Sequence, residues 1–222
     1  MPAVLFGSIG ALADTSELQR KAFNEAFRAH GLDWTWSQNE YRQLLAESGG
    51  EQRIVAYAEK TGDDVDAAAV HRTKSENFQE SLRTQPITAR PGVVETIEQA
   101  GRDGVQVALV TTTSGDNVAA LAQALRPQID VDSFALIVDS SSVEHPKPAP
   151  DAYRYALESL DEDAGDCVAV EDNVGGAQAA IAAGVLCVAF PGENNADHEF
   201  PESAHRVDEL NFGDLQAVVS HR

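Results

Sequence analysis

The sequence predicts an α/β protein: a doubly wound, Rossmann-like parallel sheet with a helical cap inserted near its N-terminus. Short apolar runs recur along the chain without polar alternation, as in strands that are covered on both faces. Amphipathic helical patterns lie between most of these runs, which is typical of a doubly wound sheet. One long stretch lacks any strand-like run, and this stretch predicts the cap.

Five apolar runs are the expected strands of the core. They span residues 4–6, 105–110, 134–138, 167–170 and 185–190. Helices are expected over residues 91–100, 148–160 and 175–183, where proline stands near a helix start or glycine follows a helix end. The core is therefore predicted to comprise residues 1–13 and 88–222.

Residues 14–87 have a helical pattern throughout. Apolar residues recur at helical spacing at Leu18, Ala22, Phe23, Ala26 and Phe27, and Gly31 can end that helix. Further helices are expected over residues 37–47, 51–60 and 63–82. We therefore predict a helical cap over residues 14–87, with hinges at residues 10–14 and 85–90.

Composition limits the partners. The chain has 222 residues, of which 43% are hydrophobic and 23% charged, and its net charge is −20. Such an acidic chain is a poor partner for nucleic acid or for an anionic membrane surface. It has no apolar run of roughly 20 residues and no signal-peptide pattern, so we expect a cytoplasmic protein. Cys167 and Cys187 lie in apolar runs and are predicted to be buried free thiols.

Polar residues follow several expected strands, at the edge where open α/β sheets bind ligands. Thr111 and Thr112 follow one run, Lys147 follows another after a loop, and Glu171 and Asp172 follow a third. A hydroxyl can bond a phosphate oxygen, a lysine can neutralise it, and paired acids can hold Mg²⁺. Simpler alternatives are a helix cap for the threonines or the acids, and a surface position for the lysine. The order and spacing of the residues favour the joint phosphate-and-metal interpretation.

This order of motifs, with a cap after the first strand, resembles the haloacid dehalogenase superfamily over essentially the whole chain. Residues 32–36, 41–42, 49–54 and 111–114 look like the sugar-bisphosphate phosphatases that act on xylulose-1,5-bisphosphate, close relatives of β-phosphoglucomutase. The resemblance implies Mg²⁺, an aspartyl-phosphate intermediate and a phosphorylated sugar as substrate. It also implies that the cap residues Arg53 and Lys74 bind substrate.

The first motif departs from the family pattern Asp-x-Asp-Gly-Thr-Leu. Gly7 stands in the place of the nucleophilic aspartate, Ile9 in that of the general acid/base, and Ala11 in that of the threonine. Two further departures lie in the cap segment, where Gln19 and Glu51 replace a histidine and a lysine of close relatives. No catalytic residue is left intact. Neighbouring Ser8 is expected to point away from position 7, and Asp14 to serve as a helix cap or hinge residue.

We therefore predict a catalytically impaired member of the family that binds a phosphorylated sugar or a similar metabolite. Whether it is an enzyme stays open: the alternatives are a weak or altered Mg²⁺-dependent sugar-phosphate phosphatase and an interaction protein with a vestigial pocket. Mg²⁺ is expected to bind weakly, through Asp172, Glu171 and the Ile9 carbonyl, and more tightly beside phosphate. No particular ligand or protein partner is indicated.

Overall fold

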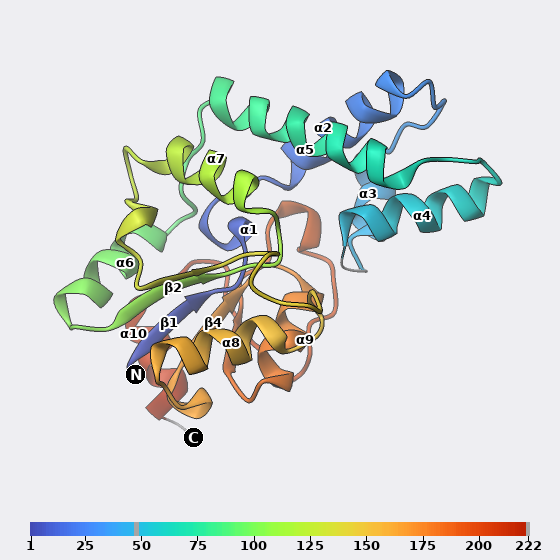
Figure 1. Cartoon of the computed structure of the whole chain (residues 1–222). Helices are drawn as coiled ribbons and strands as arrows, with labels where there is room; N and C mark the ends of the chain where they lie inside the picture. Colours follow the sequence, from blue (N-terminus) through green and yellow to red (C-terminus); the bar gives the residue numbers. More distant parts are fainter. Residues whose placement is uncertain (47–48, 221–222) are drawn as a thin grey trace.

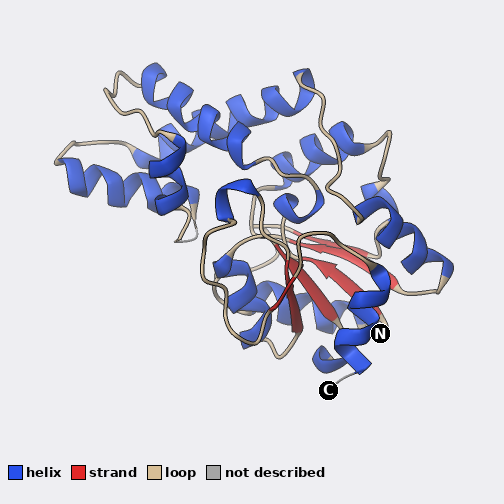
Figure 2. Cartoon of the chain, turned by 180° about the vertical axis from the view of Figure 1, so that it is seen from behind, coloured by secondary structure: helices blue, strands red, loops and turns tan. Residues whose placement is uncertain are grey.

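A computed structural model describes residues 1–46 and 49–220. Its centre is a six-stranded parallel sheet in the order β3-β2-β1-β4-β5-β6 (Figure 1; Figure 2). The strands are β1 (Ala3–Phe6), β2 (Gln106–Val110), β3 (Leu136–Val138), β4 (Val168–Glu171), β5 (Leu186–Ala189) and β6 (His205–Arg206). The predicted doubly wound α/β fold is confirmed.

Helices cover both faces of the sheet. One face carries α6 (Val93–Arg102), α7 (Gly115–Leu125) and α10 (Phe212–Ser220), and the other carries α8 (Asp151–Leu160) and α9 (Val174–Ala182). Alternate strand residues enter the two apolar clusters: Val4 and Phe6 pack on the first face, Ala3 and Leu5 on the second. Burial on both faces explains why the strands are apolar without alternation.

The predicted elements differ from the observed ones mainly at their ends. Strand β6 was missed because its two exposed residues have no apolar pattern. Helix α6 was expected to end before Gly101, but it continues to Arg102, and the positive φ of 70° falls at Gly104. Glu171 was expected to follow its strand but is the last residue of β4.

Four helices lie between the short helix α1 (Ile9–Leu12) and α6, in the upper part of Figure 1. They are α2 (Ser16–Ala29), α3 (Gln38–Leu44), α4 (Gly50–Thr61) and α5 (Ala67–Thr84), and no strand occurs among the described residues of this segment. An aromatic cluster built around Phe23, Phe27, Trp36 and Tyr41 forms their core. The expected end of the helix over 37–47 lies outside the described residues. The boundaries of the cap, 14 and 87, stay a prediction.

Polar contacts join the cap helices to the core on two sides. On one side, Gln38 Nε2 donates to Glu193 Oε1 (2.9 Å) and to Asn194 Oδ1 (3.1 Å) in the 3₁₀ turn that follows β5. On the other side, Gln79 Nε2 donates to Asn117 Oδ1 of α7 (3.0 Å). Since these core partners follow β5 and β2, the contacts hold the cap helices over the carboxyl ends of the strands.

Two further observations concern the cysteines and the length of the helices. Cys167 and Cys187 are buried and free, as predicted. None of the helices in the described parts of the chain combines the length and the apolar character that a bilayer crossing requires.

Gly92 offers a test of the packing between α6 and the segment before α10. Its φ is +79°, and an added Cβ would approach the Leu210 carbonyl oxygen closer than the 3.0 Å limit that real Cβ atoms respect. We expect Gly92→Ala to lower the free energy of unfolding by ~3 kcal/mol or more, because left-handed strain adds to the clash. Urea denaturation measures the loss.

The matched control is Gly62→Ala. Gly62 has nearly the same φ, +78°, but an added Cβ would have no neighbour within 4 Å. Its loss is expected to be only ~1 kcal/mol. Equal losses for the two variants would contradict the role assigned to the Leu210 carbonyl.

Candidate phosphate site and its neighbours

The carboxyl ends of three adjacent strands form the candidate site. Phe6 in β1 pairs with Val170 in β4 and with Leu109 in β2. The residues that follow Phe6, Leu109 and Val170 therefore reach the same edge of the sheet. These residues are Gly7, Val110 and Glu171, and they lie side by side. The Gly7 N–H continues the ladder and donates to the Val170 carbonyl (2.8 Å).

The ammonium group of Lys147 binds all three strand ends. Its Nζ donates to the Gly7 carbonyl, to the Val110 carbonyl (2.7 Å) and to Glu171 Oε1 (2.6 Å). Lys147 is only 8% exposed, so the surface-lysine alternative does not describe it. Because an ammonium has three protons, these acceptors use its full donor capacity. The predicted phosphate-binding lysine thus lies at the predicted place, but its protons are donated within the protein.

Glu171 is fully buried and has a second donor. Its Oε1 accepts a hydrogen bond from the hydroxyl of Tyr153 in α8 (2.7 Å) as well as from Lys147. Burial raises the pKa of Glu171, and the Lys147 charge opposes that rise. The pKa of Tyr153 is raised well above its usual value, mainly by burial and to a smaller extent by the charge of Glu171. The three side chains therefore form one buried, hydrogen-bonded unit.

This unit fills the space beside Gly7. A Cβ at position 7 would lie closer than 3.0 Å to Glu171 Oε1 and to the Tyr153 hydroxyl. A Cβ at Gly176, near the start of α9, would collide with both carboxylate oxygens of Glu171. The Glu171 carboxylate thus occupies a gap left by two glycines. One of them, Gly7, stands where the family motif has its nucleophile.

Asp172 points to a different set of partners. Its Oδ1 accepts from Ser8 Oγ (2.6 Å) and from Asn173 Nδ2 (2.8 Å). Ser8 caps α1 through the Ala11 N–H (3.0 Å), and Asn173 caps α9 through the Gly176 N–H (2.9 Å). The alternative interpretation made Glu171 or Asp172 the cap of the following helix. The residue that caps α9 is instead their neighbour Asn173.

Position 9 belongs to the apolar core. The Ile9 side chain is 5% exposed and packs in the cluster on the α6–α7–α10 face. Its carbonyl, which we expected to be a metal ligand, accepts the Ala13 N–H at the end of α1 (3.1 Å). Asp14 lies one residue before Thr15, the N-cap residue of α2, and its carboxylate accepts from the backbone N–H groups of Ser16 and Glu193. A hinge role for Asp14 stays a prediction.

The threonines after β2 have separate roles. Thr111 is 4% exposed, and its Oγ1 accepts the Thr113 N–H (3.2 Å). Ser114, not a threonine, caps α7 through the Asn117 N–H. Thr112 is half-buried. The hydroxyl of Thr111 thus lies at the end of β2, near the Val110 carbonyl that Lys147 binds.

The predicted cap residues lie on two different helices. Lys74 of α5 is 4% exposed, and its Nζ donates to Gln19 Oε1 (2.8 Å) and lies 4.9 Å from the Phe23 ring centroid. Arg53 of α4 donates to the Leu44 carbonyl (2.8 Å) and borders a hollow of about 250 Å³ between α3 and α4. The pKa of Lys74 is lowered to about 7, mainly by burial and to a smaller extent by the charge of Arg53.

Two further titratable groups, His71 and Tyr41, lie near these cations. Burial and the charges of Lys74 and Arg53 lower the pKa of His71 to about 4, so His71 is neutral at pH 7. Burial raises the pKa of Tyr41 to about 12, and the charges of both Arg53 and Asp172 act on its hydroxyl. Tyr41 therefore lies within electrostatic reach of the cap and of the core site.

The two acids have different partners. Among the described residues, no three His, Cys, Asp or Glu side chains converge as metal ligands. Glu171 Oε1 accepts from an ammonium and a phenol, and Asp172 Oδ1 from a hydroxyl and an amide. Mg²⁺ is often held by one or two carboxylates, with water completing its octahedron. Weak Mg²⁺ binding at these acids therefore stays a prediction.

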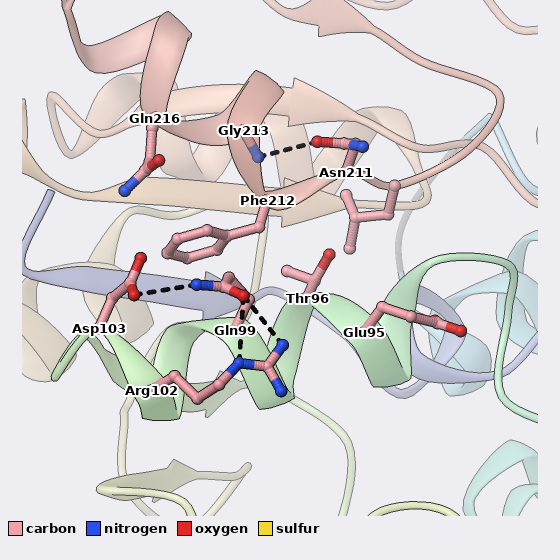
Figure 3. Close-up of a pocket in the computed structure, with 10 residues that line it drawn as sticks. Glu95, Thr96, Gln99, Arg102, Asp103, Asn211, Phe212, Gly213 and Gln216 are labelled. Carbon is pink, nitrogen blue, oxygen red and sulfur yellow. Dashed lines mark hydrogen bonds between the residues drawn. The ribbon is translucent and has the colours of Figure 1, made fainter.

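A separate hollow of about 380 Å³ lies between α6 and α10, shown in Figure 3. None of the predicted site residues lines it. Its charged residues are Glu95, Asp103 and Arg102, and Arg102 bonds Gln99 and pairs with Glu98. Acids outnumber cations there, so this hollow is a poor site for a phosphate group.

Sequence reasoning missed Tyr153. The residue recurs with Ala152, Ala156 and Leu157 on the buried face of α8, and this spacing marks it as ordinary core. Its hydroxyl, which bonds Glu171, lies where an added Cβ at Gly7 would approach closer than 3.0 Å. A tyrosine on an otherwise small, apolar helix face was the one available signal, since a buried phenol needs a partner.

The chain is similar to known proteins along its whole length. A family model described as haloacid dehalogenase-like hydrolase matches residues 1–184. Protein CbbY from Cereibacter sphaeroides is 39% identical over 220 residues, which cover 98% of this chain and 95% of that protein.

Two solved structures share the fold closely. A crystal structure of CbbY from Rhodobacter sphaeroides in complex with phosphate has a TM-score of 0.89 and 38% identity, with 99% of both chains covered. A mutant CbbY in complex with xylulose-(1,5)bisphosphate has a TM-score of 0.87 and 39% identity, with 94% of both chains covered. The resemblance stated from the motifs is confirmed at the level of the family.

The buried pair of Lys147 and Glu171 predicts a strong stability effect. Lys147→Met leaves the Glu171 carboxylate and two carbonyl groups without their donor, so we expect a loss of ~3–5 kcal/mol in the free energy of unfolding. Adding Glu171→Gln removes the stranded charge, so the double variant should be more stable than Lys147→Met alone. Urea denaturation of the four proteins gives the coupling energy.

The control for this cycle is Lys60→Met. Lys60 is exposed on α4, and its loss is expected to change stability by less than ~0.5 kcal/mol. Additive effects of the Lys147 and Glu171 substitutions would contradict the assigned pair.

Proposed function

Because the chain belongs to the haloacid dehalogenase-like hydrolase family, we propose that it binds a phosphorylated sugar or a similar metabolite while its phosphoryl-transfer step is impaired. One observation carries the proposal: the space beside Gly7 is filled by Glu171 and Tyr153. The position where the family motif places a nucleophile thus has neither a carboxylate nor room for one.

The chemical argument starts from the two motif positions. Gly7 offers no oxygen to attack phosphorus, and the buried side chain of Ile9 carries no proton to a leaving group. The nearest carboxylate, that of Glu171, is held by Lys147 and Tyr153. Nucleophile and acid/base act as a unit, and the loss of such a unit lowers rates on the order of 10⁴–10⁶.

The binding argument rests on the cap. Lys74 donates to an amide oxygen, so its partner does not cancel its charge, and the ring of Phe23 favours a cation beside it. The charge of Arg53 also acts on Lys74. A desolvated ammonium near a guanidinium favours an anionic ligand group. Complexes of CbbY with phosphate and with xylulose-(1,5)bisphosphate support a phosphorylated sugar as the ligand class.

A weak or altered sugar-phosphate phosphatase is the second candidate. The half-buried carboxylate of Asp172 favours it, because Ser8 and Asn173 orient that group at the strand ends. An oriented carboxylate can accept a proton from an attacking water without any covalent intermediate. The rate of phosphate release separates this candidate from the proposed function.

Metal and location complete the proposal. The sequence led us to expect weak Mg²⁺ binding at Asp172 and Glu171. Lys147 holds Glu171 Oε1, whereas the bonds of Asp172 all end on its Oδ1, so in this proposal Asp172 is the acid that would hold the metal. We place the protein in the cytoplasm, as the composition led us to expect; its buried, unpaired thiols support this placement.

The proposed function is tested by measuring turnover and binding on the same sample. We expect phosphate release from sugar mono- and bisphosphates to fall several orders of magnitude below the usual ~1–10³ s⁻¹, with no detectable aspartyl-phosphate. Calorimetry should detect saturable binding of a phosphorylated sugar, and Lys74→Met should weaken it.

Two outcomes would reject the proposed function. Turnover at ordinary rates, in protein free of contaminating phosphatase, would show that another residue performs the reaction. The absence of any saturable phosphosugar binding would instead favour the interaction protein with a vestigial pocket.

The pKa of Lys74 makes anion binding depend on pH. The ammonium is charged below about pH 7 and loses its proton above it. A bound anion needs the charged form, so the affinity should fall about tenfold per pH unit above 7, up to the higher pKa of the complex. Sulfate is the suitable probe, because its charge stays constant from about pH 6 to pH 9.

Lys74→Arg is the control for this pH profile. A guanidinium stays protonated over the whole range, so the affinity of this variant for sulfate should not change with pH. Calorimetric titration at several pH values compares the two proteins. The same flat profile in the unsubstituted chain would contradict a role for Lys74 in anion binding.

A further inference from the structure

The cap helices are joined to the core in two different ways. On the α5 side the attachment is largely apolar, because Phe78 and Leu82 are buried in the core cluster that also contains Val118 and Leu121 of α7. Helix α3 instead contributes Tyr41 to the separate aromatic cluster of the cap and meets the core through polar side chains. Apolar surfaces lose burial when they separate, whereas polar groups gain hydration in return. The α3 side is therefore the easier one to open.

Asn194 is the centre of the contact on the α3 side. It is 1% exposed and lies in the 3₁₀ turn Glu193–Asn195 that follows β5. Its Oδ1 accepts from Gln38 Nε2 (3.1 Å) and from Arg42 Nε (3.3 Å). Its Nδ2 donates to Ser16 Oγ (3.2 Å). One buried side chain of the core thus bonds two helices of the cap, α2 and α3.

Other polar contacts surround the amide of Asn194. Arg42 lies 4.0 Å from Glu193 Oε1 and 3.8 Å from Asp197 Oδ2, but all three side chains are a third or more exposed, and such ion pairs contribute little. His198 Nε2 donates to the Arg42 carbonyl (2.8 Å). Because water competes least for a buried polar group, the bonds to Asn194 contribute most to the contact.

The turn that carries Asn194 is well anchored. Its Glu193 N–H donates to Asp14 Oδ2 (2.6 Å). Just before the turn, the carbonyls of Phe190 and Pro191 accept from the Arg90 guanidinium (2.6 and 2.7 Å). Asp14 and Arg90 each belong to one of the two expected hinges. The turn is therefore fixed beside the segments about which the cap would move.

We propose that Asn194 is a latch that keeps the cap closed over the strand ends. While its bonds are made, α2 and α3 are held on the core. When they break, the cap can turn about its apolar attachment to α7 and uncover the strand ends. The latch goes beyond the proposed function and does not rest on it, because the position of the cap is defined with or without a bound ligand. Its test accordingly uses the protein alone.

The test measures the separation of cap and core in the full chain by pulsed electron paramagnetic resonance. Spin labels are attached to Lys60→Cys on α4 and to Arg154→Cys on α8, which are exposed positions, whereas the two native cysteines are buried. The parent protein should give one main separation. In Asn194→Ala the population with a longer separation should rise at least about fivefold, as the net loss of one hydrogen bond produces.

Asn195→Ala is the matched control. Asn195 is the next residue of the same turn and is 3% exposed, but its Oδ1 has no hydrogen-bond partner. This variant should keep the main separation of the parent protein. If Asn195→Ala increases the longer population as much as Asn194→Ala does, the turn as a whole holds the cap and the latch assigned to Asn194 is wrong.

Gln38→Ala decides the question if Asn194→Ala does not fold. Gln38 is half-buried on the cap, and its loss removes the bonds to Asn194 and to Glu193, so this variant should also increase the longer population. Urea denaturation establishes which variants fold. Where Asn194→Ala folds, its own result decides, and a separation unchanged from the parent protein in the deciding variant would overturn the inference.

Discussion

The ammonium of Lys147 is the group on which the arrangement of the strand ends depends. Parallel strands present carbonyl groups at their carboxyl ends, and buried carbonyls need donors. Lys147 supplies donors to β1 and β2 and neutralises the carboxylate at the end of β4. Tyr153 donates a second hydrogen bond to the same oxygen of that carboxylate, Oε1. These bonds hold the three strand ends together through the protein's own groups.

The two halves of the candidate pocket differ in how their charges are matched. At the strand ends each carboxylate has partners of opposite charge or hydrogen-bond donors close by. In the cap, the ammonium of Lys74 lies beside aromatic rings and bonds a neutral amide. Electrostatic attraction for an anion is therefore concentrated in the cap. This division supports the binding part of the proposed function.

The fold was largely predictable because strands buried on both faces of the sheet consist of continuous apolar runs. In addition, the residues that follow parallel strands all lie at the carboxyl edge of the sheet. Motif comparison also located Lys147, Glu171 and Asp172. What it could not give was the direction of the Glu171 carboxylate, which depends on a side chain that is absent at position 7. Tyr153 was hidden for a related reason, since its helical spacing is that of a core residue. The short strand β6 carries no burial pattern at all.

Gly7 also bears on what an aspartate at this position would require of its neighbours. A single substitution restores the aspartate of the motif, but the added atoms enter space that Glu171 and Tyr153 already fill. The glutamate must first leave two donors, in a buried environment where charge is costly to expose. An aspartate at position 7 therefore requires Glu171 and Tyr153 to move, although both lie far from it in the sequence. The conformation of one strand end is thus coupled to side chains of β4 and α8.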